Sequence, residues 1–307
     1  MKNQSTCFEF LRFIIILVGC TSNLFSQNVN TPIEVCRTRT YSEAPVFDKD
    51  GNIFISESYR GPVIKISPAG DTMTWAVLEQ PNGHEVLPDG NHLICDMRMQ
   101  AIVKLDPFGK VIEEGVCKTC GDYPIGAPND IVLDDKGGYY FTDCGQIVNG
   151  ELKFGDGKIC YVDANDKSYF LAGLNGMPNG ITINADYTTI YVAQSMKNRI
   201  LSYKINSIGD VDFPEVFVKV PVLEDGTWSG PDGIEINKDN GKLYVTQFGA
   251  GKVYEFNPDG HFIRSIPVGQ KNCSNIAFSK EDNNMIFVTG SPGELQEGGI
   301  LYKIKIN

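Results

Sequence analysis

Six polar residues with oxygen-bearing side chains recur along the chain, each just before a short run of β-prone residues. They are Glu43, Asn82, Asn129, Asn179, Asp232 and Asn275. Their spacing of roughly 40 to 50 residues is typical of arrays of small repeated units. Carboxylate and amide oxygens are the ligands that hard divalent cations prefer. If the six side chains meet in the fold, they predict a cation site that can polarise an incoming substrate oxygen.

The clearest copy of the repeated unit runs from residue 126 to residue 143. It opens with a Pro-Asn-Asp turn, continues through an apolar run at 131–133 and returns, after a polar Gly-containing turn, at 139–143. Two short β-prone runs around such a turn predict a β-hairpin. A third short apolar run and a further turn follow each hairpin. Six strand-only repeats of about 45 residues predict an all-β fold, a six-bladed β-propeller.

The propeller geometry brings the six residues together. The first strand of each blade is innermost, and these strands run parallel to one another around the axis, so residues just before them meet at one mouth of the channel. The second strands return to the same face, and we expect their last residues to form an outer shell around the ring. These residues are Glu57, Asp96, Asp143, Ser195 and Phe248. Because Asn and Asp are also common turn residues, turn formation is the alternative explanation of each single position.

Composition supports one large domain without a nucleic-acid partner. The repeats fill nearly all of residues 28–307, and 42% of the 307 residues are hydrophobic. A strand candidate at 33–35 precedes the first repeat and could complete the last blade. The net charge of −11, without a basic stripe, disfavours binding to a phosphate backbone. We expect a monomer that acts on a small-molecule substrate.

Residues 1–26 carry a targeting pattern rather than part of the fold. Lys2 and Arg12 accompany an apolar run at 13–19 that is too short to span a bilayer. Residues 17–20 are similar to a bacterial lipobox, which would make Cys20 an acylated first residue and the only membrane anchor. The alternative is cleavage near Ser26. Either site predicts an exported protein, which is periplasmic, an outer-membrane lipoprotein or secreted.

Seven cysteines follow the signal region, an odd number that leaves at least one thiol unpaired. Cys117 and Cys120 form a lone C-x-x-C, which without a second pair is weak evidence for zinc. Export permits disulfides. The alternatives are a local disulfide, a disulfide between this loop and Cys144, or unpaired cysteines.

The residues around four of the ring positions carry a family resemblance. Glu43-Ala44-Pro45-Val46, Ala127-Pro128-Asn129-Asp130, Met177-Pro178-Asn179-Gly180 and Gly230-Pro231-Asp232-Gly233 resemble the motifs of the SMP-30/gluconolactonase (regucalcin-like) family. The resemblance covers about residues 40 to 305. It implies a six-bladed propeller with one divalent metal on the axis that hydrolyses sugar lactones or related esters, while some relatives cleave organophosphates.

The resemblance also implies roles for individual residues. Glu43, Asn179 and Asp232 would be the core metal ligands, with Asn129 as a further ligand or a substrate contact. Asp232 would also be the catalytic residue, as general base or as partner of the nucleophile. Calcium fits best by ligand type, and zinc, manganese or magnesium are alternatives.

Substrate contacts are predicted less directly. Sugar-lactone members have an Arg two residues before Asn129, but this chain has Ala127, which puts sugar-acid lactones in doubt. Arg60 or Arg98 could reach the mouth instead. We also expect Asn82 and Asn275 to contact substrate, with His84 inside the channel as an aid to proton transfer.

The resulting hypothesis is metal-assisted hydrolysis of a lactone or small ester, in which the cation polarises the carbonyl. A phosphotriesterase-like hydrolase at the same metal is the second enzymatic hypothesis. The non-enzymatic alternative is a propeller that binds a ligand or partner and holds a structural ion.

Overall fold

The structure is a computed structural model. It describes residues 30–149, 151–153, 155–296 and 298–306. The predicted signal peptide (1–26) and the predicted acylation site Cys20 lie outside the described residues. No helix in the part of the chain that is described is long and apolar enough to cross a membrane.

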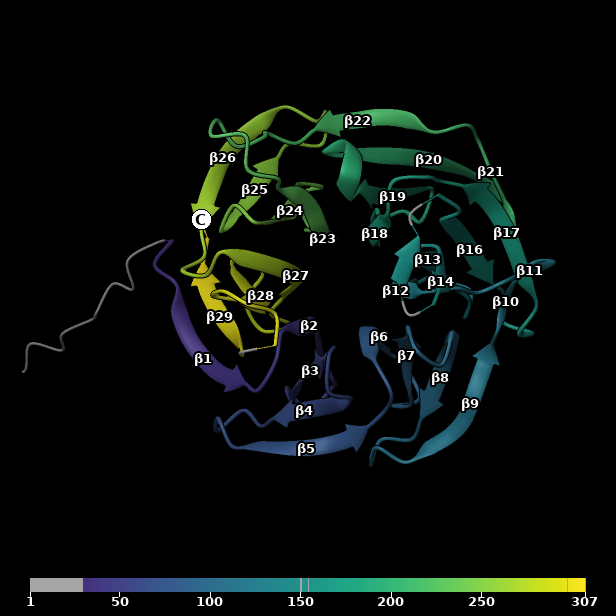
Figure 1. The fold of residues 1–307 in the computed structure, drawn as a ribbon, viewed down its shortest axis with the longest axis horizontal. Helices are drawn as coiled ribbons and strands as arrows, with labels where there is room; N and C mark the ends of the chain where they lie inside the picture. The colour runs from purple at the N-terminus through teal and green to yellow at the C-terminus, as the bar shows by residue number, and fades with distance from the viewer. Residues whose placement is uncertain (1–29, 150, 154, 297, 307) are drawn as a thin grey trace, which may run out of the picture.

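Six antiparallel sheets, five of four strands and one of five, surround a central axis (Figure 1), which confirms the predicted six-bladed propeller. The first blade contains β2 (Ser42–Phe47), β3 (Ile53–Glu57), β4 (Pro62–Ile66) and β5 (Thr72–Val77). The second contains β6 (Pro81–Val86), β7 (His92–Asp96), β8 (Ala101–Leu105) and β9 (Val111–Cys117). The third contains β12 (Pro128–Leu133), β13 (Tyr139–Asp143), β16 (Lys158–Val162) and β17 (Ser168–Gly173).

The remaining three blades follow the same plan. The fourth contains β18 (Pro178–Ile183), β19 (Thr189–Gln194), β20 (Arg199–Ser207) and β22 (Glu215–Lys219), with β21 (Asp210–Val211) at its edge. The fifth contains β23 (Gly230–Ile236), β24 (Leu243–Phe248), β25 (Lys252–Phe256) and β26 (Phe262–Pro267). The sixth contains β27 (Asn272–Phe278), β28 (Met285–Ser291), β29 (Gly299–Lys305) and β1 (Ile33–Thr38).

The two ends of the fold meet in the sixth blade. β1 pairs antiparallel with β29, so the first strand of the chain forms the outer edge of the last sheet (Figure 1). The sequence had predicted this role for residues 33–35. The shared sheet closes the ring of blades, and closure holds the six innermost strands at fixed positions around the axis.

The hydrophobic core consists of six clusters, one between each pair of neighbouring blades. Between blades one and two, for example, Phe54 of β3 packs with Ile94 and Val103. Second strands such as β7 and β13 are buried along their whole length. A strand buried on both faces reads as a continuous apolar run, which is why these strands were recognisable in the sequence.

Short elements lie in three of the connections, one between the second and third blades and two directly after second strands. They are the hairpin of β10 (Thr119–Cys120) with β11 (Tyr123–Pro124), the hairpin of β14 (Gln146–Val148) with β15 (Glu151–Lys153), and the 3-10 helix η1 (Ser195–Lys197).

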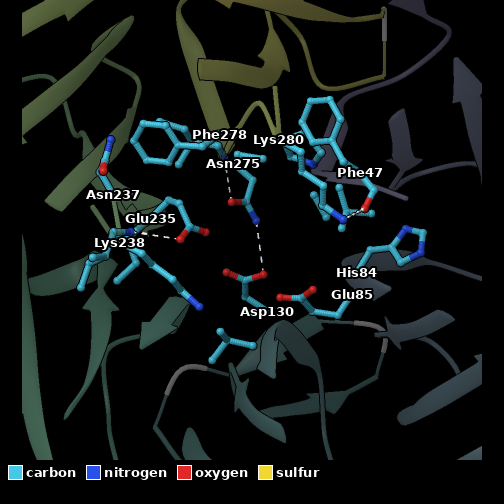
Figure 2. Close-up of a pocket in the computed structure, with 18 of the residues that line it drawn as sticks. Phe47, His84, Glu85, Asp130, Glu235, Asn237, Lys238, Asn275, Phe278 and Lys280 are labelled. Atoms are coloured by element: carbon cyan, nitrogen blue, oxygen red, sulfur yellow. Dashed lines mark hydrogen bonds between the residues drawn. The ribbon is translucent and has the colours of Figure 1, made fainter. Parts of the chain in front are cut away.

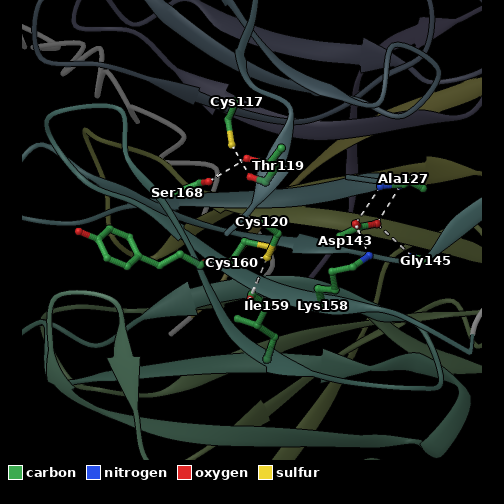
Figure 3. Close-up of a disulfide and its surroundings, with 12 residues drawn as sticks. Cys117, Thr119, Cys120, Ala127, Asp143, Gly145, Lys158, Ile159, Cys160 and Ser168 are labelled. Carbon is green, nitrogen blue, oxygen red and sulfur yellow. Dashed lines mark hydrogen bonds and ion pairs between the residues drawn. A yellow bond between two sulfur atoms is a disulfide. The ribbon is translucent and has the colours of Figure 1, made fainter. Parts of the chain in front are cut away.

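A disulfide joins Cys120 of β10 to Cys160 of β16 (Figure 3). Both disulfide pairings considered from the sequence, Cys117 with Cys120 and this loop with Cys144, are therefore wrong. Cys117 is a free thiol whose Sγ donates to the Thr119 carbonyl at 2.9 Å. Cys144 donates to the Pro178 carbonyl at 3.1 Å. Chain folding, rather than spacing, makes Cys160 the partner, because β16 is forty residues beyond Cys120.

Candidate metal and substrate site

Five of the six predicted ring residues line one cavity of about 480 Å³ at a mouth of the central channel. They are Glu43, Asn82, Asn129, Asn179 and Asp232. All five side chains are buried, with Glu43 4% and Asp232 6% exposed. Each comes from the innermost strand of a different blade, so the closed propeller places five oxygen-bearing side chains around one point on the axis.

Each innermost strand has a β-bulge at its ring position or directly after it. In β12 the register moves from Pro128 opposite Asp143 to Ile131 opposite Phe141, so that Asn129 lies within the bulge, and β6, β18, β23 and β27 have the same irregularity. In β2 the bulge comes one position later, after Glu43, which is opposite Ser56. A bulge adds a residue to one strand and re-aims the side chains beside it. We infer that these bulges turn the ring side chains toward the axis.

The ring residues lie within strands, so turn formation does not explain them. Asn179 and Gly180 belong to β18, and Asp232 and Gly233 belong to β23. A Cβ at Gly180 would lie 2.4 Å from the Asp232 carbonyl oxygen, and one at Gly83 would lie 2.5 Å from that of Asn129. These glycines are therefore required because neighbouring innermost strands approach closely, not because the backbone turns there.

Hydroxyl groups of one blade hold the backbone of the next blade's ring position. Ser56 of β3 donates to the Asn82 carbonyl at 2.9 Å, and Thr142 of β13 donates to the Asn179 carbonyl at 2.6 Å. Ser195 donates to the Pro231 carbonyl, directly before Asp232, at 2.7 Å. Buried carbonyl groups that are paired in this way fix the ring positions relative to one another.

Two residues beside the ring have left-handed backbone conformations. Ala44, directly after Glu43, has φ of 44°, and Met177, two residues before Asn179, has φ of 62°. Neither is a glycine, so each conformation carries a cost that the surrounding fold must offset. Non-glycine residues in this region cluster at sites where a fold holds side chains in a required geometry.

The two carboxylates of the ring share a buried environment with Tyr41. The Tyr41 hydroxyl donates a hydrogen bond of 3.0 Å to Oδ2 of Asp232. Burial raises the pKa of Asp232. Burial and then the charge of Asp232 raise the pKa of Glu43. Among the described residues, no Lys, Arg or His forms an ion pair with either carboxylate.

This donor set fits a hard divalent cation. Two adjacent buried carboxylates without a basic partner are costly unless a cation neutralises them. The nearby amide oxygens of Asn129 and Asn179 supply neutral ligands of the kind that calcium accepts. A bound cation would reverse the pKa elevation, because it favours the charged forms. No group of three His, Cys, Asp or Glu side chains in the described ranges could hold a metal by itself, so the amides are needed.

The predicted position of Asn275 in the ring is wrong. Register places Cys273 opposite Gly290 and Ile276 opposite Val288, so Ser274, not Asn275, is equivalent to Asp232. Asn275 lines a second cavity of about 420 Å³ and its Nδ2 donates to Asp130 at 3.3 Å (Figure 2). The comparison of the six repeats placed this ring position one residue too late, because Ser274 and Asn275 are both polar.

His84 also lies outside the ring cavity. It lines the second cavity, and its Nε2 is 2.8 Å from Nδ1 of His92, within an aromatic cluster with Trp75 and Phe54. The sequence predicted that His84 lies inside the channel and aids proton transfer. The structure does not bring it to the ring carboxylates. Asn82 is the one predicted substrate contact that lines the ring cavity.

Arg98 is exposed and does not line the ring cavity, and neither does Arg60. The three carboxylates that end second strands are not in the cavity lining either. Asp96 accepts backbone N–H groups of Gln80 and Met99, and Asp143 accepts those of Gly126 and Ala127 (Figure 3). These carboxylates pin the loops that lead into the innermost strands of their own blades, as Glu57 does through the N–H of Arg39. The carboxylates of the predicted outer shell are therefore structural, whereas its other two members, Ser195 and Phe248, line the ring cavity.

Apolar side chains surround the mouth of the ring cavity, and of these only Phe248 was predicted from the sequence to lie near the ring. They are Tyr59, Met97, Met177, Met196, Trp228 and Phe248. Tyr41, which sequence reasoning also missed, lies two residues before Glu43. A search of the residues preceding each innermost strand would have found it.

The second cavity, at the other end of the innermost strands, is lined by four carboxyl residues, of which Glu85, Asp130 and Glu235 are labelled in Figure 2 and the fourth is Asp239. Burial raises the pKa of Asp130 to about 6, of Glu235 to about 7 and of Glu85 to about 8. Lys238 and Lys280 also line this cavity. Asp130 accepts hydrogen bonds from the backbone N–H of Ile181 and from Asn275, so it joins blades three, four and six.

Comparison with known proteins matches the chain to one protein family and to lactonases. The family model described as SMP-30/Gluconolactonase/LRE-like region matches residues 41–291. Lactonase drp35 of Staphylococcus epidermidis is 28% identical over 273 residues, which cover 84% of this chain and 81% of that protein. Lactonase drp35 of Staphylococcus aureus is 24% identical over 289 residues, covering 89% of this chain and 85% of that protein.

Solved structures share the fold. A gluconolactonase from Xanthomonas campestris superposes with a TM-score of 0.76 at 20% identity, covering 90% of this chain and 89% of that chain. A calcium-binding regucalcin from Agrobacterium tumefaciens superposes with a TM-score of 0.73 at 20% identity, covering 90% of this chain and 92% of that chain. At these identities the likeness concerns the propeller itself.

Proposed function

Because the chain belongs to the SMP-30/gluconolactonase/LRE-like family, we propose that it is a hydrolase of lactones or small esters that depends on a divalent cation. The observation that carries the proposal is the pair of buried carboxylates, Glu43 and Asp232, which have no basic partner in the described part of the chain and lie at the bottom of an open cavity. The names of its relatives, lactonase and gluconolactonase, support the reaction class.

Glu43, Asn129, Asn179 and Asp232 are the residues that would hold the cation. When bound, it would supply Lewis acidity toward the substrate carbonyl oxygen and lower the pKa of nearby acids. We propose calcium, because the donors are carboxylate and amide oxygens, with zinc, manganese or magnesium as substitutes. The calcium-binding regucalcin among the structural neighbours is consistent with this choice.

Asp232 is the proposed general base. Its carboxylate accepts a proton from a water molecule, whose oxygen adds to the carbonyl carbon of the lactone. The ring C–O bond then breaks, the leaving oxygen takes up the proton, and the product is the open hydroxy acid. The Tyr41 hydroxyl, held to Oδ2 of Asp232, keeps the carboxylate in one orientation. The amide N–H groups of Asn82 and Asn129 are available at the cavity to bind substrate oxygens.

The test is hydrolysis of a lactone panel by wild-type protein and by Asp232→Asn. We expect the variant to lose at least about a hundredfold in kcat, because it lacks both a base and a ligand charge. Asp259→Asn, in an exposed turn of the same blade, is the matched control and should keep full activity. If the Asp232 variant stays fully active, the mechanism is wrong. Phosphotriesters in the same panel test the second enzymatic hypothesis, and an inactive but ligand-binding wild type would favour the non-enzymatic one.

We propose in addition that the protein is exported, with a signal segment at residues 1–26. The disulfide between Cys120 and Cys160 supports this proposal, because structural disulfides persist mainly in oxidising compartments. Cell fractionation of wild type and of Cys20→Ser distinguishes a lipid-anchored from a soluble exported protein. Recovery of both forms from the cytosolic fraction would contradict the proposal.

A further inference from the structure

We infer, on the basis of the proposed function, that the substrate is an uncharged lactone or ester that carries an alkyl or aryl substituent. A polyhydroxylated sugar-acid lactone is the alternative that the cavity disfavours. The inference rests on how polar and apolar side chains are distributed between the depth and the mouth of the ring cavity.

Four aromatic rings form a continuous wall from the ring carboxylates to the mouth. Tyr41 is hydrogen-bonded to Asp232. The centroid of its ring lies 6.2 Å from that of Tyr59 and 6.1 Å from that of Phe248. Phe248 in turn lies 5.9 Å from Trp228. A substrate whose carbonyl reaches the ring must therefore place the remainder of its body against aromatic surface.

Several large apolar side chains at the mouth of the cavity are exposed to solvent, although burial would be more favourable for them. Tyr59 and Trp228 are each 46% exposed and Met196 is 43% exposed. Met97 and Met177 complete this border of the cavity. Apolar groups gathered around a concave site, instead of being scattered singly, mark a surface that binds an apolar ligand. Methionine side chains are flexible, so the border can adapt to substituents of different shapes.

The described lining of the cavity contains no cationic group that would pair with a charged substituent, and its amide side chains are the ring residues and Gln80 rather than residues of the apolar mouth. No Lys, Arg or His is among its described lining residues, and its charged residues are Glu43 and Asp232 at the bottom. A carboxylate on the substrate would be repelled by this pair and would find no cationic partner. Hydroxyl groups held against Trp228 and Met196 would lose hydrogen bonds to water without replacement.

The first experiment compares lactones of equal ring size that bear an alkyl chain, an aryl group, several hydroxyl groups or a carboxylate. We expect kcat/KM to be at least about tenfold higher for the alkyl and aryl compounds, since apolar contacts of this size give tenfold to hundredfold discrimination. Preference for the polyhydroxylated or the carboxylate compound would overturn the inference but leave the proposed hydrolase intact. Failure to hydrolyse any lactone, with calcium present, would overturn the proposed function itself.

The second experiment tests the residues. Trp228→Ala should lower kcat/KM for the alkyl lactone by about tenfold, mainly through KM, and lower it less for the unsubstituted lactone. Phe213→Ala removes an aromatic side chain that is 97% exposed and outside the cavity, and it should change neither value. Met196→Lys adds a cation to the border and should improve the relative kcat/KM for the carboxylate compound by about tenfold. Equal effects of the Trp228 variant on all lactones, or no effect of either cavity variant, would overturn the inference.

Discussion

At the bottom of the ring cavity, one hydrogen bond links the aromatic wall to the proposed general base. The Tyr41 hydroxyl donates to Oδ2 of Asp232 at 3.0 Å, and both groups are buried. Burial and the nearby carboxylates raise the pKa of Tyr41, so the phenol keeps its proton at neutral pH. Tyr41 is therefore a positioning residue that acts through Asp232 rather than a base of its own.

Tyr41→Phe should lower kcat by about tenfold and change KM by less, because the carboxylate loses its fixed orientation while the cavity keeps its shape. Stopped assays over a range of lactone concentrations separate the two parameters. Tyr123→Phe, at a half-exposed position away from the cavity, is the matched control. A drop in kcat/KM caused by KM alone would mean that the hydroxyl binds substrate instead of orienting Asp232.

Glu85, at the other end of the channel, permits a prediction about stability. Burial, then the charges of Glu235 and Asp130, raise its pKa from 4.5 to about 8, despite the opposing effects of Lys238 and Lys280. The folded state thus binds a proton more tightly than the unfolded state, so this group's contribution to stability is present below pH 4.5 and is lost as pH rises through 8.

Glu85→Gln should therefore stabilise the protein at pH 8 by about 1 kcal/mol or more, and have little effect near pH 5. Urea unfolding at the two pH values measures the difference. Glu114→Gln, on the exposed face of β9, should leave stability unchanged at both values. A variant that is no more stable than wild type at pH 8 would show that Glu85 is not held in an unfavourable environment.

At the residue scale, the sequence predicted the chemistry better than the geometry. Glu43, Asn129, Asn179 and Asp232 were identified because their types and spacing stand out, and they do line one cavity. Asn275 was misplaced by one residue because adjacent polar residues give no signal of register. Side chains such as Trp228 could not be predicted to line the site, since loop conformation brings them there.

Within each blade, the innermost strand and its bulge position the site. The equivalence of the six bulges explains why the Asn and Asp side chains converge although their blades differ in loop length. The second strands add the hydroxyl groups that hold the neighbouring blade. The hairpins were predictable from alternating apolar and turn residues, whereas a bulge leaves no mark on such a pattern.

The substitution Thr142→Val tests whether the second-strand hydroxyl groups stabilise the contact between neighbouring blades. Thr142 is fully buried, donates to the Asn179 carbonyl at 2.6 Å and accepts the backbone N–H of Asp130 at 3.1 Å. Valine has nearly the same shape but leaves both buried groups unpaired, so unfolding free energy should fall by about 1 to 3 kcal/mol. Differential scanning calorimetry measures the loss, with Thr72→Val on the exposed outer strand β5 as control. Equal stability of the two variants would mean that the inter-blade hydroxyl contributes little.

On the scale of the whole molecule, closure makes the site possible. β1 completes the sixth blade through its pairing with β29, and the six interblade clusters leave the innermost strands little freedom to move. The number of blades was predicted by counting the repeats. The closing strand was predicted from the segment at 33–35, which precedes the first repeat. The disulfide partner could not be predicted, because Cys120 and Cys160 are adjacent only after the third blade folds.

The ring assembled by this closure is a set of buried oxygens that includes two carboxyl groups with no basic partner among the described residues. A site of this kind should bind one divalent cation per chain, and binding should stabilise the folded state by mass action. Removal of the cation should then both abolish hydrolysis and lower the melting temperature, since the two carboxylates would be left to repel each other.

Calorimetric titration of calcium into chelator-treated protein tests the central claim most directly, with wild type, Glu43→Gln and the exposed-site control Asp259→Asn compared at equal concentration. The account predicts one site per chain in wild type and in the control, with affinity at least about tenfold weaker in Glu43→Gln, which loses one ligand charge. Absence of calcium, zinc, manganese and magnesium binding to wild type, or equal affinity in all three proteins, would contradict it.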